Sequence, residues 1–164
     1  MNGLIYQINV KLETPGERGI PKNSIDVVKV KFSGVNGDYN RYRTEKKNGN
    51  LDKAVMFLSV ETLNDLRKEG WSVYPGYLGE NFTTVGIPYS SFKIGQRYDI
   101  GQAQIEITEP CQPCNNLSVL SYVGEEKIKN FMRTLIGRRG WYAKVLVEGK
   151  VEKGDSIEKI LYRS

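Results

Sequence analysis

The sequence contains no histidine, and this absence excludes a large share of enzyme chemistry. Histidine is the commonest general base near neutral pH and the commonest metal ligand in proteins. Catalysis by a Ser-His-Asp or Cys-His arrangement is therefore excluded, together with most zinc hydrolase sites. Any chemistry has to come from cysteine, carboxylate, Lys, Arg or Tyr side chains, or from a bound cofactor.

Long apolar runs and an N-terminal signal are also missing. No run approaches the roughly 18 apolar residues that a membrane helix requires. The first residues, MNGLIYQINVKLE, lack a basic segment followed by a long apolar one. We therefore expect no secretion signal, no membrane association and a cytoplasmic location. Only two cysteines are present, and in that compartment thiols are expected more often than a structural disulfide.

The 164 residues carry a net charge of +5, and their length suits one domain spanning residues 1–164. The basic residues are interspersed with acidic ones, apart from a run at 41–47 and the pair Arg138-Arg139. Neither cluster has the interleaved aromatic residues of a single-strand binding platform. Clusters of this size also suit a phosphate-bearing small molecule. A nucleic-acid-binding barrel is therefore only the third hypothesis for function.

Alternating apolar and polar residues predict a mainly β (α+β) fold. The alternation covers residues 4–10, 25–32, 103–108 and 141–147, and Glu148-Gly149 is expected to form a hairpin turn after the last of them. The side chains expected to face the core are Val28, Val30, Phe32, Ala103, Ile105, Ile107, Trp141, Ala143, Val145 and Val147.

Two segments have the pattern of amphipathic helices. In the first, Ser59 is expected to cap the N-terminus and Gly70 to end the helix. In the second, before Gly137, apolar residues follow helical spacing at Ile128, Phe131, Met132, Leu135 and Ile136. Many short strands with few helices predict a closed or nearly closed β-barrel with a few flanking helices.

Both cysteines lie in the short segment EPCQPC, at Cys111 and Cys114. Spacing alone leaves four interpretations open: a redox pair or disulfide, half of a zinc site, a single thiolate for a soft metal, or two small buried residues. A zinc site would lack two ligands in this chain. Pro110 and Pro113 fix the backbone around the cysteines, which favours a preset loop over a packed interior.

Several longer stretches resemble one family in the correct order from about Ser33 to Ile160. Residues 74–87, YPGYLGENFTTVGI, resemble P-G-x-x-G-E-N-[LIF]-[TS]-x-x-G-[ILV], and FKIGQRYDIGQAQIEITEPCQPC resembles the strand pair and P-x-x-P-C loop that follow it. GRRGWYAKVLVEGKVEKGDSI resembles the closing strand and G-D turn, and NGDYNRYR and NLDKAVMFLS resemble two earlier stretches. The family is the MOSC domain family, named for the C-terminal domain of molybdenum-cofactor sulfurase.

The resemblance implies a β-barrel that binds the pyranopterin molybdenum cofactor. Members include reductases of N-hydroxylated compounds, such as hydroxylaminopurines and amidoximes, and terminal domains of enzymes that sulfurate the cofactor. In the reductases a cysteine ligates molybdenum, and alignment of the loop places that ligand at Cys114. Cys111 falls where relatives often carry another residue, so its role stays open.

The resemblance also implies roles for other residues. Glu80 is a candidate catalytic residue that could orient neighbours or bridge a cation, and Asn81 could donate its amide to the pterin. A local turn is the alternative for both. The remaining cofactor-binding candidates are cations expected at the rim of the barrel: Arg41, Arg43, Lys53, Arg138 and Arg139.

Two functions follow as expectations. The first is a reductase of N-hydroxylated compounds supplied by a separate electron-donor protein, because no pyridoxal phosphate, flavin or iron–sulfur cluster is expected in this chain. The alternative is a non-catalytic carrier of the cofactor, or of persulfide sulfur, that exchanges with a sulfur-donating or sulfur-accepting partner. Where relatives often carry histidine, this chain has Tyr39 and Asn40, so a proton relay would need water, Glu80 or Tyr39. A monomer or a homodimer is expected.

Overall fold

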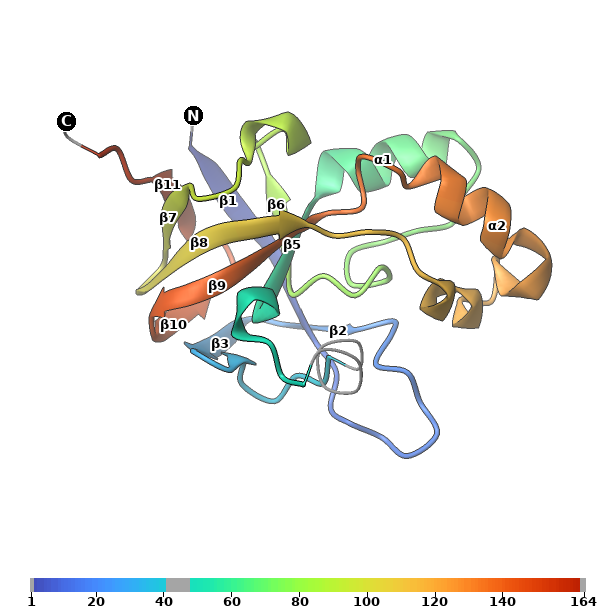
Figure 1. Ribbon diagram of the computed structural model, residues 1–164, viewed down its shortest axis with the longest axis horizontal. Coiled ribbons are helices and arrows are strands. Elements are labelled where there is room, and N and C mark those ends of the chain that lie inside the picture. The colour runs from blue at the N-terminus through green and yellow to red at the C-terminus, as the bar shows by residue number, and fades with distance from the viewer. Residues whose placement is uncertain (1, 41–47, 163–164) are drawn as a thin grey trace.

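A closed seven-stranded β-barrel forms the centre of the computed structural model, which describes residues 2–40 and 48–162 (Figure 1). The strands lie in the order β1-β11-β7-β8-β9-β5-β6, and the pairing of β11 with β1 closes the barrel. All neighbours are antiparallel except β5 and β6. The strands are β1 (Gly3–Val10), β5 (Val55–Ser59), β6 (Phe82–Val85), β7 (Arg97–Ile100), β8 (Ala103–Pro110), β9 (Trp141–Val147) and β11 (Ser156–Lys159). The predicted β-barrel with flanking helices is confirmed.

A small second sheet closes one side of the barrel core. It has the order β10-β3-β4, with β3 at Val27–Lys31, β4 at Gly34–Val35 and β10 at Gly149–Glu152. The short strand β2 (Asn23–Ile25) extends the barrel sheet beside β1. The expected hairpin at Glu148-Gly149 is wrong, because β10 pairs with β3 and not with β9.

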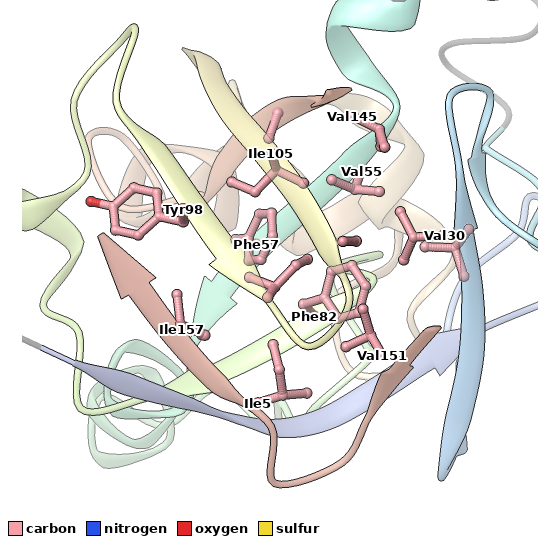
Figure 2. Packing of buried hydrophobic residues seen from close by; sticks show 14 of the residues in the cluster. Ile5, Val30, Val55, Phe57, Phe82, Tyr98, Ile105, Val145, Val151 and Ile157 are labelled. Carbon is pink, nitrogen blue, oxygen red and sulfur yellow. The ribbon is translucent and has the colours of Figure 1, made fainter. Parts of the chain in front are cut away.

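The barrel interior is filled by side chains from both sheets. Figure 2 shows Val30 and Val151 of the small sheet pointing toward Phe82 and the other barrel side chains. Phe57 and Phe82 stack at its centre, with ring centroids 5.2 Å apart. Since apolar burial is the main favourable term in folding, this cluster is the principal source of the barrel's stability.

Alternation predicted most inward-facing residues but failed at strand ends. Phe32 is 49% exposed and Val147 is 48% exposed, so both expectations are wrong. Phe32 follows the last residue of β3, and Val147 ends β9, so neither reaches the covered part of the barrel. Ile136 is also wrong: helix α2 (Gly124–Thr134) ends before it, and the side chain is 69% exposed.

The described residues form two α-helices, which pack together at one end of the barrel (Figure 1). Helix α1 (Val60–Lys68) begins after Ser59, whose side chain accepts the Thr62 amide, as its cap pattern predicted. Short 3-10 turns complete the fold at η2 (Leu51–Lys53), η3 (Tyr89–Ser91) and η4 (Asn115–Val119). A second apolar cluster joins the helices to the loops beside them: Leu58, Leu63, Leu66, Val73, Leu78, Leu117, Leu120, Val123, Ile128, Phe131 and Leu135. No helix among the described residues is long and apolar enough to cross a membrane.

Candidate functional site

A pocket of about 160 Å³ lies where β8 leaves the barrel and β9 enters it. Its wall is made by the loop after β8, the start of β9, the start of β5 with η2, and loop residues from 18–22, 39–40 and 78–79. Segments far apart in the sequence therefore converge on one cavity. We call it the cysteine pocket, because both cysteines line it.

The cysteine loop is attached to the barrel at one end. The backbone amide of Cys111 donates to the Gly140 carbonyl at 2.7 Å, which continues the ladder between β8 and β9. Cys111 is buried, whereas Cys114 is only partly buried and precedes η4. Both are free thiols. In the described part of the chain, no group of three His, Cys, Asp or Glu side chains is arranged to hold a metal ion.

Arg139 brings a positive charge to the buried side of the pocket. Its side chain is 5% exposed, and its Nη1 donates to the Met56 sulfur at 3.8 Å. Its Nε is buried and has no hydrogen-bond partner among the described residues. Burial lowers the pKa of Arg139, but the neighbouring Cys111, Tyr142 and Cys114 together raise it above its usual value.

Lys53 is also buried in the pocket wall, but unlike Arg139 it has a carboxylate partner. Its ammonium group forms an ion pair with Glu109 and lies 4.5 Å from the centre of the Tyr142 ring. Burial, followed by the charge of Cys111, raises the pKa of the Tyr142 hydroxyl. Tyr142 is therefore a neutral hydroxyl at the pocket wall. It was not recognised in the sequence, because its place in an alternating strand gave no sign of a pocket.

Glu80 lies behind the pocket wall and not on it. Its Oε1 accepts from the Gly76 amide at 2.7 Å and from the Thr83 hydroxyl at 2.9 Å. Its Oε2 is buried and has no partner among the described residues. Burial raises the pKa of the Glu80 carboxyl, and the nearby charge of Arg139 opposes this only in part. The position fits local support of the turn, and Arg139 influences it only through its charge.

Asn81 is part of a buried polar network that joins two sequence motifs. Its side-chain oxygen accepts the Met56 amide at 3.1 Å, and its amide group donates to Asp38 at 2.8 Å. Asp38 also pairs with the Lys22 ammonium at 2.7 Å, and both of these side chains are almost fully buried. The G-D stretch and the G-E-N stretch therefore meet in space. Lys22, which lines the pocket, was not recognised because its loop has no periodic pattern.

The structure does not bring all the predicted cations together. Arg138 turns away to form two hydrogen bonds with Glu69 after helix α1, at 2.7 and 2.6 Å, and it is absent from the pocket wall. Lys53 and Arg139 do line the pocket with Cys114. Arg41 and Arg43 lie outside the described residues. The site that results has one partly exposed thiol, one buried thiol and a buried guanidinium.

Comparison with known proteins identifies relatives over most of the chain. The sequence profile of the MOSC domain matches residues 44–158. A Gibberella moniliformis protein named "Reductase" is 31% identical over 130 residues, which is 76% of this chain and 22% of that protein. The Bacillus subtilis protein YflK, described as uncharacterized, is 34% identical over 80 residues, which is 49% of this chain and 35% of that protein. The chain therefore spans well under half the length of these curated relatives.

Solved structures share the fold. YuaD from Bacillus subtilis superposes with a TM-score of 0.81 at 21% identity, covering 99% of this chain and 98% of that one. YiiM from Geobacillus stearothermophilus gives a TM-score of 0.73 at 25% identity, covering 97% and 75% of the two chains. The agreement extends over essentially the whole described chain.

Proposed function

This chain belongs to the MOSC domain family, and from that premise we propose that it binds the pyranopterin molybdenum cofactor and reduces N-hydroxylated compounds. The observation that carries the proposal is the position of Cys114. Its thiol lies on the wall of the cysteine pocket and is partly exposed, and the buried Arg139 lines the same pocket. A relative named a reductase supports the same class of chemistry.

The described residues fit such a cofactor in the kind of donors they offer. Cys114 supplies a soft sulfur ligand for a metal. Arg139 supplies a buried positive charge with a free Nε, and an anionic group can use both. Tyr142 supplies a neutral hydroxyl on the same wall. When bound, the cofactor supplies two-electron redox chemistry at the metal.

The reaction places two demands on the protein. Reduction of an N–OH group to N–H consumes two electrons and two protons and releases water. The electrons would come from a separate donor protein. Without histidine, solvent in the pocket is the simplest source of protons, because Glu80 lies behind the pocket wall. Arg139 would hold the ligand and limit the build-up of negative charge beside the sulfur.

The decisive test compares the two cysteines. Cys114→Ser and Cys111→Ser proteins would be produced with full cofactor supply, and molybdenum per protein would be measured by elemental analysis. We expect molybdenum retention to fall at least tenfold in Cys114→Ser and to stay within about twofold of wild type in Cys111→Ser. Reduction of a hydroxylaminopurine by an artificial electron donor should follow metal content. Equal molybdenum in wild type and Cys114→Ser would refute the ligand assignment.

The presence of two free thiols on one pocket favours a second candidate function. In this alternative the chain is a carrier of the cofactor, or of sulfur held as a persulfide on Cys114, and Cys111 is its neighbour inside the wall. Such a carrier needs no proton relay, which agrees with the absence of histidine. It predicts cyanide-labile sulfur on the Cys114 peptide, detected by mass spectrometry, and no reduction of N-hydroxylated substrates when a donor is present.

A further inference from the structure

The cysteine pocket contains a buried positive charge that no described carboxylate balances. Arg139 is 5% exposed and lines the pocket, yet no described Asp or Glu oxygen lies within the 4.0 Å of an ion pair. Its Nε is without a hydrogen-bond partner in the described chain, and its Nη1 contacts only the weak acceptor sulfur of Met56. An ionised group buried in this way costs several kcal/mol unless an anion reaches it.

The buried lysines of the same wall do not share this condition. Lys22 is paired with Asp38 at 2.7 Å, and Lys53 is paired with Glu109. These pairs cancel their own charges locally. The imbalance is therefore specific to Arg139 and does not arise from a generally basic surface.

The nearest buried carboxyl does not correct the imbalance. Glu80 is close enough for its charge to act on Arg139, but its Oε1 is committed to the Gly76 amide and the Thr83 hydroxyl. Burial raises its pKa and so favours the neutral acid. Glu80 forms no ion pair with Arg139, so the guanidinium N–H groups are left to the contents of the pocket.

We propose that Arg139 is the anion-binding residue of the cysteine pocket, and that its ligand is a compact oxyanion of the phosphate class held beside the thiols. A guanidinium presents its N–H groups as a planar fork that matches two oxygens of such an anion. The free Nε and the pocket-facing position of Arg139 supply that fork.

This inference rests on the proposed function only for the source of the anion. A pyranopterin carries a phosphate, and a free phosphorylated or other oxyanionic ligand offers the same chemistry. The site itself follows from the charge imbalance alone. Its test therefore begins with protein that has received no cofactor and with inorganic phosphate as the probe.

The first measurement is calorimetric titration of the purified full chain with inorganic phosphate, against sodium chloride at matched ionic strength. We expect saturable phosphate binding that weakens at least tenfold in Arg139→Met and is partly kept in Arg139→Lys, which retains the charge but not the fork. Arg138→Met is the matched control, because this neighbouring arginine binds Glu69 away from the pocket. It should keep the wild-type affinity within about twofold.

A second measurement uses wild-type protein and so does not depend on whether a variant folds. Phosphate bound at Arg139 should slow alkylation of Cys114 by iodoacetamide several-fold, as quantified on the Cys114 peptide by mass spectrometry. Phosphate binding that survives unchanged in Arg139→Met would indicate an adventitious ion only. That result, or a wild-type protein that binds no phosphate and gains no protection, would overturn the proposal.

Cofactor loading then identifies the source of the anion. If loaded protein no longer binds phosphate, the cofactor's own phosphate fills the site. If loaded protein still binds it, the ligand is a separate oxyanion. A chain that never loads but still binds phosphate through Arg139 would refute the proposed function and leave the anion site in place.

Discussion

Lys22 and Arg139 are two of the three buried cations that line the cysteine pocket, and their surroundings differ completely. Lys22 lies in a finished network: its ammonium binds Asp38, and Asp38 also accepts from the Lys11 amide and the Asn81 side chain. Arg139 has no such partners among the described residues. The charge of Lys22 is therefore balanced without a ligand, whereas the charge of Arg139 is not.

The same cavity therefore contains polar groups that stabilise the fold and a polar group that is free to bind a ligand. A buried polar network with every member satisfied stiffens the fold, and the removal of one member is costly. A buried charge without a partner destabilises the folded state and is available to bind an anion. Lys22 should therefore respond to mutation through stability, and Arg139 through ligand binding.

The largest expected effect is on the Lys22 side. Asp38→Ala leaves a buried ammonium and two amide donors without their acceptor, so we expect a loss of about 3–5 kcal/mol in the free energy of unfolding. Urea denaturation would measure it. Arg139→Met is the matched variant and should not lower the free energy of unfolding, because it removes a buried charge that has no described partner. Equal losses in both variants would erase the distinction between the regions.

The next effect tests the backbone that supports Arg139. Gly140 has φ +121°, and a Cβ there would lie 2.6 Å from the Phe57 carbonyl. Gly140→Ala should cost about 1–3 kcal/mol in backbone strain and weaken phosphate binding as well. Gly137→Ala is the control, because φ is +77° and a Cβ would meet no atom within 4 Å. Wild-type phosphate affinity in Gly140→Ala would mean that this close packing does not position the guanidinium.

The third prediction tests whether the Glu80 carboxylate is ionised and pairs with Arg139. Its folded pKa is raised, so the native state holds the proton longer, and the free energy of unfolding falls as pH rises above the ordinary value of 4.5. Glu80→Gln resembles the protonated acid and should remove this part of the slope. Its stability relative to wild type should therefore improve between pH 4.5 and 7.5 in urea denaturation.

The exposed Glu126→Gln on helix α2 serves as the control for Glu80→Gln and should leave the slope unchanged. If Glu80→Gln were instead less stable near neutral pH, Glu80 would be ionised and paired with Arg139. The contrast between the two cations would then fail.

The smallest expected effect concerns Arg138, the neighbour of Arg139 that binds Glu69 outside the pocket. Its hydrogen bonds with Glu69 hold the pKa of that carboxyl below its usual value, so this stabilisation is present at neutral pH and lost as pH falls through the folded pKa. Because the pair is exposed, Glu69→Gln should lower Tm by at most about 2 °C at pH 7. The difference in Tm should shrink as the pH is lowered, and phosphate affinity at neutral pH should be unchanged.

Local sequence patterns predicted those features of the strands and helices that depend on neighbouring residues. Ser59 caps α1, and Ala103, Ile105 and Ile107 face the core, because capping and alternation depend on near neighbours. The partner of β10 could not be predicted in this way, since pairing with β3 depends on how distant segments close the core. Alternation likewise predicts the face of the strand on which Phe32 lies. It does not predict that the core no longer covers this face beyond the end of β3.

The candidate site was predicted in its chemistry more than in its arrangement. The cysteine loop, Lys53 and Arg139 were identified by residue type and family resemblance, and they do converge. Nothing in the sequence separated Arg138 from Arg139, although the fold sends their side chains in different directions. The partner of Asp38 was also hidden, because Lys22 meets it only through the folded loops.

The hydrogen bond from the Cys111 amide to the Gly140 carbonyl joins the two ends of the intervening segment, residues 112–139. Residues 112–139 leave the barrel and return to it at the same rung, so their two ends are fixed whatever lies between them. Only the two ends of this segment, residues 112–117 and Arg139, contribute to the pocket wall, whereas helix α2 in its middle packs in the second apolar cluster. Substitutions at the two ends can therefore change what the pocket accepts while the barrel and the helix packing stay as they are.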